Sequence, residues 1–237
     1  LFTMIRETVD KAVTGALSKL GADTVPSGKY NIIMDSPTVC SLLQTYAGVF
    51  SARSAYLKTT LLAGKEGEGI AADCVTLVGD PFHPENPMPM AFDAEGSPTA
   101  KKNIIEKGMF NTLLYNLKTA AVAGKETTGN ASKAGYDAPV GIRPFTMYLA
   151  GGELTPDELL QKAGNGVYIN SLGGLHAGAN PVTGDFSLQS AGFMIENGVK
   201  TTAVKSFTVA GNFYELLKNV VVMADNCHLP RAMGSTA

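Results

Sequence analysis

Asn197 and Gly198 divide a long stretch of strand-forming residues into two halves, and this feature limits the possible folds more than any other. Residues 186–195 and 199–209 lie on either side of the pair and have the composition of strands. An Asn-Gly pair between two strands favours a type I′ turn, in which both central residues take positive φ. The sequence therefore predicts a long antiparallel hairpin.

Other patterns add helices and further strands around this hairpin. Residues 106–108 (EKG) predict a second turn, between residues 103–105 and 109–110. The spacing of apolar residues predicts helices over residues 2–20, 37–50, 156–163 and 212–220, and strands over residues 30–34, 73–78 and 166–172. Because strands and helices do not alternate regularly, the pattern favours an α+β fold with a mainly antiparallel sheet or barrel and flanking helices.

Two segments are predicted to be loops. Five prolines follow the strand expected at residues 73–78: Pro81, Pro84, Pro87, Pro89 and Pro98. Proline lacks a backbone donor and fixes φ, so this segment is expected to be a surface loop and not a central strand. Residues 124–139 are rich in small and polar side chains, and we expect them to form a mobile loop.

Composition and charge exclude several classes of protein. Apolar residues make up 45% of the 237 positions, and 19 basic against 21 acidic side chains give a net charge of −2. The basic residues are scattered, which argues against a nucleic-acid-binding surface, and no apolar stretch approaches the roughly 18 residues of a membrane span. The three cysteines, Cys40, Cys74 and Cys227, form no C-x-x-C pair, as is typical of a reducing compartment. We therefore expect a cytoplasmic protein that binds neither nucleic acid nor membrane.

Few residues are spaced in a way that indicates a catalytic or metal-binding site. The three histidines are far apart in the sequence, and no H-E-x-x-H motif, P-loop or G-x-S-x-G motif occurs. His83 lies in the proline-rich segment, where a solvated side chain is expected, and the adjacent Cys227 and His228 would point to opposite faces of an extended chain. His176 lies among glycines, where a backbone can approach a ligand closely, so it is a candidate for lining a cleft.

Motifs in the second half of the chain follow one another in a characteristic order. They are NGVYI (165–169), HAGANPVTGDFS (176–187), AGFMIENG (191–198), FTVAGNF (207–213) and MADN (223–226), preceded by PSGKY (26–30) and AFDAEGSPT (91–99). This order resembles the C-terminal region of the TldD/PmbA family, from about residue 23 to the end of the chain. The resemblance implies that residues 1–22 are a helix from the family's middle region, that residues 23–237 are the C-terminal domain, and that the family's N-terminal α/β domain is absent from this chain.

The resemblance also implies a type of subunit. In this cytoplasmic protease system, a TldD-type subunit carries a metal on an H-E-x-x-x-H helix and pairs with a PmbA/TldE-type subunit that lacks it. The family is linked to peptide maturation, to antitoxin degradation and to the older label of DNA gyrase modulator. Gln44, Thr45 and Val49 stand at the motif positions here, and they cannot replace two imidazole ligands and a carboxylate base. The chain thus resembles the PmbA/TldE type, so we expect no cofactor in it and zinc only in a TldD-type partner.

Part of the family motif is a candidate for lining a peptide cleft. The candidate residues are His176, Thr183, Gly184, Asp185 and Ser187. If the family binds unfolded peptide by adding it to a sheet edge, backbone groups supply the affinity and few side chains are diagnostic. The alternative is structural, since such residues also build a hairpin and its turn, and for residues 196–198 we favour that interpretation.

Three functions stay open at this point. The first is a subunit without its own metal site in a TldD/TldE-type metalloprotease, which acts on unfolded peptide with a TldD-type partner. The others are a stand-alone hydrolase with an unrecognised site and a protein that binds peptide without cleaving it. The low charge content leaves apolar surface for an interface, so we expect a homodimer when no partner is present.

Overall fold

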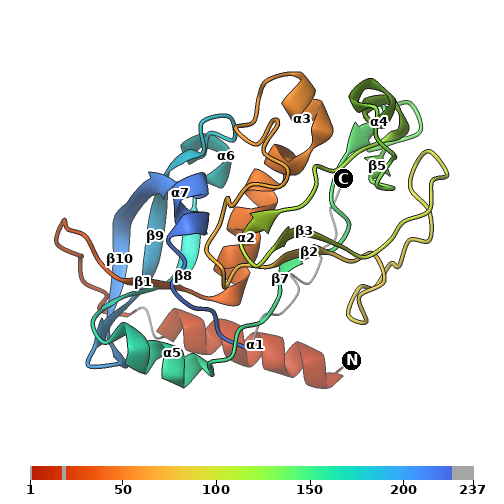
Figure 1. The fold of residues 1–237 in the computed structure, drawn as a ribbon. Coiled ribbons are helices and arrows are strands. Elements are labelled where there is room, and N and C mark those ends of the chain that lie inside the picture. The colour runs from red at the N-terminus through yellow and green to blue at the C-terminus, as the bar shows by residue number, and fades with distance from the viewer. Residues whose placement is uncertain (1, 18–19, 226–237) are drawn as a thin grey trace.

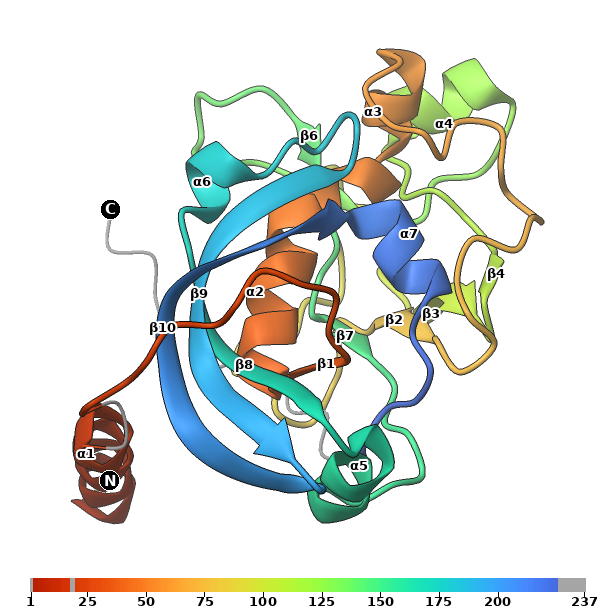
Figure 2. The same ribbon diagram turned by 90° about the vertical axis from the view of Figure 1, so that its left-hand side faces the viewer.

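Two four-stranded sheets lie on opposite sides of helix α2 (Ser36–Tyr46), as Figures 1 and 2 show. The computed structural model describes residues 2–17 and 20–225. Both sheets are open, and neither closes into a barrel. The α+β prediction is therefore confirmed, in its form with open and mainly antiparallel sheets.

The predicted long hairpin dominates the first sheet, which curves around α2 (Figure 2). Its strand order is β1-β8-β9-β10, with β1 (Ile32–Met34), β8 (Gly166–Gly173), β9 (Asp185–Glu196) and β10 (Val199–Asn212). Asn197 and Gly198 have φ of 52° and 76°, as a type I′ turn requires. One pairing departs from the antiparallel pattern, because β1 runs parallel to β8.

The turn at Gly198 leaves no room for a side chain. A Cβ atom there would lie 2.6 Å from Oε1 and 2.8 Å from Cα of Gln161. We expect Gly198→Val to lower the free energy of unfolding by about 2 kcal/mol, because it adds this collision to an unfavourable positive φ. Urea denaturation measures the loss, and Val199→Thr at the exposed neighbouring position is the control. Equal midpoints for Gly198→Val and the parent would contradict the expectation.

The second sheet is smaller and fully antiparallel. Its order is β4-β3-β2-β7, with β2 (Leu77–Gly79), β3 (Lys102–Glu106), β4 (Met109–Phe110) and β7 (Met147–Leu149). The predicted turn between β3 and β4 is confirmed. The strand expected over residues 73–78 begins later, at Leu77, because Val75 donates its N–H to Ala72 O (2.8 Å) in a preceding turn.

All four predicted helices are present, and the helices that the sequence did not predict are short. A 3₁₀ turn, η1 (Ala47–Phe50), extends α2 over the predicted range, and α5 (Pro156–Ala163) and α7 (Phe213–Lys218) also follow the predictions. Thr155 and Glu158 form a capping box at the start of α5. The unpredicted helices are α3 (Ala52–Tyr56), α4 (Leu117–Ala123) and α6 (Leu175–Gly178).

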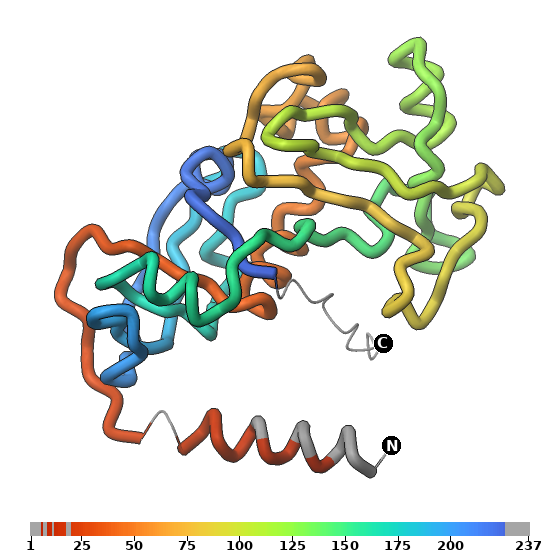
Figure 3. Tube along the Cα trace, turned by 60° about the horizontal axis from the view of Figure 1, so that its bottom comes forward, coloured from red at the N-terminus to blue at the C-terminus, as the bar shows by residue number. Residues whose placement is uncertain are grey.

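Helix α1 (Phe2–Leu17) stands apart from the sheets, as Figures 2 and 3 show. Its side chains Val9, Val13 and Leu17 are all more than half exposed. The segment after it reaches the first sheet at Asp23, whose N–H donates to Ala203 O (2.9 Å). Within the described ranges, no helix is both long and apolar enough to cross a membrane.

The two predicted loops are tied to each other. The proline-rich segment forms turns on the surface, and the buried carboxylate of Asp93 accepts N–H groups from Glu95, Ser97 and Ala131. Ala131 belongs to β5 (Ala131–Ser132), which pairs with β6 (Gly141–Ile142). The segment over residues 124–139 thus contains a short strand, and its mobility stays a prediction.

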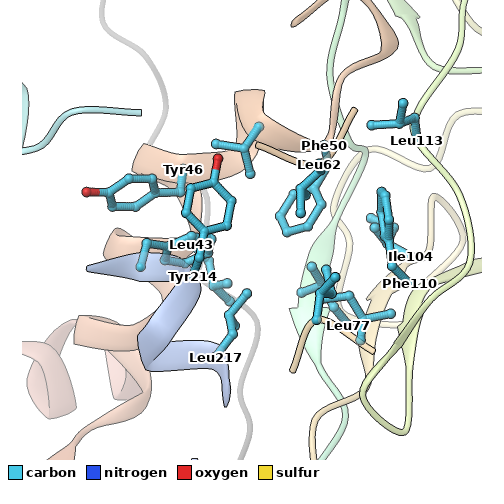
Figure 4. Packing of buried hydrophobic residues seen from close by; sticks show 14 of the residues in the cluster. Leu43, Tyr46, Phe50, Leu62, Leu77, Ile104, Phe110, Leu113, Tyr214 and Leu217 are labelled. Atoms are coloured by element: carbon cyan, nitrogen blue, oxygen red, sulfur yellow. The ribbon is translucent and has the colours of Figure 1, made fainter. Parts of the chain in front are cut away.

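The main core holds α2 in place from both sides (Figure 4). Leu43 and Tyr46 of α2 lie beside Tyr214 and Leu217 of α7. Side chains of the second sheet face them, and the group includes Leu77, Ile104 and Phe110, with Phe50 and Leu62 in between. This packing fixes the helix on which the candidate site lies.

Candidate functional site

Helix α2 begins directly after β1, and its first turn is fixed to the first sheet. The Asp35 carboxylate caps the helix by accepting the N–H of Thr38 (2.9 Å). The Asp35 N–H donates to Ile169 O on β8 (3.1 Å). Pro37 suits the first turn of the helix, because N–H groups there have no acceptor within the helix and the missing N–H of proline costs no hydrogen bond. The start of α2 is therefore held by both its sequence and the sheet.

The three residues at the motif positions do not point to a common centre. Gln44 is exposed on α2, and the half-buried Thr45 donates its hydroxyl to Ser41 O (2.9 Å) one turn earlier. Val49 lies in η1 and is only 1% exposed within the core. The set contains no imidazole, thiolate or carboxylate, so these side chains do not fit a zinc ion.

Tyr46 lies between these positions and joins α2 to two other segments. It is fully buried, and its hydroxyl donates toward the carbonyls of Gly184 (3.1 Å) and Asp185 (3.0 Å). Its ring stacks on Phe213 of α7, with 4.3 Å between the centroids and 5° between the planes. Burial raises the pKa of Tyr46 to about 12, and the nearby Asp185 and Tyr214 add to the shift. Tyr46 is therefore a neutral hydrogen-bond donor at neutral pH.

The carbonyls that Tyr46 contacts belong to residues 180–185, which we call the signature turn. Gly184 closes the turn by donating its N–H to Asn180 O (2.8 Å). Asn212 holds the turn from the side, since its Nδ2 donates to Thr183 O (2.9 Å) and to Asp185 Oδ1 (2.8 Å). The bond from Asn212, and then one from the Thr183 hydroxyl, lower the pKa of Asp185. The motif residues are thus part of one hydrogen-bonded unit with α2 and α7.

The structure brings most of the predicted cleft residues to one end of the β9–β10 hairpin. Thr183 and Asp185 are exposed, Gly184 is buried beneath them, and Ser187 is exposed on β9, opposite Ala210. His176 is exposed on α6, which packs against β9. Their role in binding peptide stays a prediction, because a hydrogen-bonded turn accounts for the same residues.

Two residues of this unit escaped the sequence analysis, although both lie within the segments it singled out. Tyr46 lies between Gln44 and Val49, and Asn212 belongs to the FTVAGNF motif. Asn212 also caps α7, since its Oδ1 accepts the N–H of Tyr214 (3.0 Å). An Asn before an amphipathic run is a cap signal that could have revealed this second role.

The remaining candidates for metal binding are not brought together. Among residues 2–17 and 20–225, no three His, Cys, Asp or Glu side chains form a group that could hold a metal ion. His83 lies in the proline-rich loop, where its Nδ1 accepts the N–H of Glu85 (3.2 Å) and its ring meets Tyr148 edge-on. Cys227 and His228 lie outside the described residues.

Comparison with known proteins agrees with the motif resemblance. The family model described as the PmbA/TldA metallopeptidase C-terminal domain matches residues 27–237. A metalloprotease of Methanothermobacter thermautotrophicus is 33% identical over 217 residues, which cover 91% of this chain and 46% of that protein. The chain thus spans about half the length of this relative.

Two solved structures share the fold. TldE from Thermococcus kodakarensis superposes with a TM-score of 0.82 at 29% identity, over 90% of this chain and 48% of that one. A Thermotoga maritima chain described as a proposed modulator of a DNA gyrase superposes with a TM-score of 0.83 at 37% identity. The match covers 88% of this chain and 47% of that one. The chain therefore belongs to the PmbA/TldD metallopeptidase family.

Proposed function

We propose that this chain acts as a PmbA/TldE-type subunit of a metallopeptidase and leaves the catalytic metal to a TldD-type partner. The observation that carries the proposal is the arrangement of the three motif positions on α2 and η1. Gln44 faces solvent, the Thr45 hydroxyl is bonded to its own helix, and Val49 is in the core. A zinc site needs three or four nitrogen, sulfur or carboxylate ligands around one point, and Gln44, Thr45 and Val49 supply none of them.

The first sheet offers this subunit a way to hold an unfolded peptide. Strand β10 is an edge strand, and its outer side pairs with Asp23, which bonds to Ala203 O and to the N–H of Lys205. Ser206 then takes a positive φ of 58°, which interrupts the strand. Among the described residues, no segment pairs with the outer side of β10 at residues 207–212. Free backbone groups on such an edge bind extended chains without selecting their sequence.

Peptide on this edge would lie near the residues predicted to line the cleft. Ser187 is directly opposite Ala210, and Asp185 is opposite Asn212. Thr183 and Asp185 expose polar side chains beside that end of the edge, and His176 lies on α6 against β9. In this proposal these side chains orient the peptide, and the catalytic groups come from the partner.

Metal content and partner-dependent cleavage test the proposal together. After dialysis, elemental analysis should find well under one zinc per chain, because the three motif positions lack ligands. Labelled casein, used as an unfolded substrate, should be cleaved only when a metal-bearing TldD-type subunit is added. Gln44→Ala and Thr45→Ala should leave that cleavage unchanged, whereas replacing the glutamate of the partner's own H-E-x-x-x-H motif should abolish it.

The other two functions give different results in the same experiments. A stand-alone hydrolase would cleave casein without the partner, and a protein that only binds peptide would bind casein without ever supporting its cleavage. We expect the chain alone to form a homodimer in light scattering. A monomer that neither co-elutes with a TldD-type subunit nor increases its activity would rule out the subunit role.

A further inference from the structure

Helices α3 and α4 contact each other at one end of the molecule (Figures 1 and 2). Together with residues 57–65 they expose five large apolar side chains, namely Tyr56 (68%), Leu57 (54%), Leu61 (52%), Leu117 (50%) and Val122 (63%). Single exposed apolar residues are common on proteins, but several on two touching helices are typical of an interaction surface. We call these two helices and residues 57–65 the α3–α4 surface.

A hollow lies beside α4 in this surface. Its volume is about 580 Å³, and its lining is mostly small or apolar: Pro98, Leu117, Ala120, Ala121, Lys125, Glu126 and Thr127. The short side chains of the two alanines leave the hollow open next to the exposed Leu117. The hollow is shallow and open, so it has room for the tip of an apolar side chain from a partner.

The charge of the α3–α4 surface is opposite to that of the chain as a whole. Residues 51–66 and 116–127, which include Glu126 of the hollow, contain five basic side chains and two acidic ones, although the whole chain has a net charge of −2. Four of these side chains, Arg53, Lys58, Lys65 and Lys118, are exposed, and in the described part of the chain none has a carboxylate within 4 Å. The fifth, Lys125, is paired with Glu66. The surface therefore combines apolar contact area with excess positive charge.

We propose that the α3–α4 surface binds a protein segment that carries apolar side chains flanked by Asp and Glu. The apolar side chains would enter the hollow and cover Leu117 and Val122. The acidic ones would meet the lysines, which favours association and selects against basic segments. Nucleic acid would use the positive charge but leave the apolar side chains uncovered. A flat lipid surface would leave the hollow unfilled. This inference does not depend on the proposed peptidase role.

The test uses two labelled helical peptides of about 18 residues, with leucine at positions i, i+3, i+4 and i+7. In one peptide the flanking residues are glutamate, and in the other they are lysine. Fluorescence anisotropy at low salt should show binding of the glutamate peptide at least roughly tenfold tighter than of the lysine peptide. The double variant Leu117→Ser with Val122→Ser should weaken binding of the glutamate peptide by a similar factor. The control variant Val199→Ser, at an exposed site on the hairpin, should leave this binding unchanged.

A charge reversal makes the test independent of folding defects. The double variant Lys65→Glu with Lys118→Glu should no longer bind the glutamate peptide and should bind the lysine peptide instead. An unfolded protein would not give this result. The proposal is overturned if the parent binds both peptides equally or neither of them. It is also overturned if phosphatidylserine vesicles bind the parent, and not the α3–α4 variants, while the glutamate peptide does not bind.

Discussion

Replacing Tyr46 by alanine should lower the free energy of unfolding by about 3–5 kcal/mol, the range for removing a large buried ring. The substitution opens a cavity in the centre of the core, because Tyr46 is fully buried. It also removes the ring that stacks on Phe213 and the hydroxyl that joins α2 to the signature turn. Urea denaturation followed by circular dichroism measures the loss.

Two matched variants separate the parts of this effect. Tyr46→Phe keeps the stacked ring. The carbonyls of Gly184 and Asp185 also keep the hydrogen bonds that they accept from Phe213 N and Asn180 N, respectively. This variant should therefore lose only about 1 kcal/mol of unfolding free energy. Tyr56→Ala removes an exposed ring on α3 and should change stability little. If Tyr46→Ala and Tyr56→Ala unfold at the same urea concentration, Tyr46 does not hold the site together.

The hydroxyl of Tyr46 also makes the stability of the fold depend on pH at high pH. An unfolded tyrosine ionises near pH 10, whereas the pKa of Tyr46 in the fold is about 12. The folded protein therefore keeps this proton where the unfolded chain releases it, and stability falls as the pH rises from 10 to 12. This part of the fall should be absent in Tyr46→Phe.

These contacts explain how helix α2 keeps its position without metal ligands. Its first turn is held by Asp35 through the cap on Thr38 and the bond to Ile169. Its last turn is held by Tyr46 through backbone carbonyls and an aromatic stack. A helix fixed at both ends by the protein itself needs no metal to order it, which agrees with the role proposed for this subunit.

Features set by neighbouring residues could be predicted from the sequence. The Asn197–Gly198 turn, the capped helix after Thr155 and the helix after Asp35 each depend on a few adjacent residues. The strand expected at residue 73 began at Leu77 because a turn through Val75 competes with extension. Helices α3 and α4 were missed, since five and seven residues are too few for a clear apolar period.

Features set by distant residues could not be predicted in the same way. The parallel pairing of β1 with β8 joins segments far apart in the sequence, and no local pattern reports it. The same holds for Tyr46, whose partners lie in the signature turn and in α7. The motif resemblance found the signature turn, but only the fold shows that Asn212 and Tyr46 hold it.

Gly184 is the residue of the signature turn that has the least freedom to change. Its φ is +85°, a value that side chains with a Cβ atom rarely adopt. A Cβ atom there would lie 2.5 Å from the Tyr214 ring and 3.0 Å from Asn212 Oδ1. Both neighbours are fixed, because Tyr214 is buried and Asn212 holds the turn. Substitution thus disturbs two segments at once.

Gly184→Ala should therefore lower the free energy of unfolding by about 3–4 kcal/mol, since strained φ and a collision act together. Gly64→Ala is the matched control, because Gly64 has a similar φ of +75° but a Cβ atom there would have no neighbour within 4 Å among the described residues. The control should lose only about 1 kcal/mol, the part due to φ alone. Urea denaturation of both variants gives the difference. If the two losses are equal, crowding by Tyr214 and Asn212 contributes nothing, and the glycine is required only for its backbone conformation.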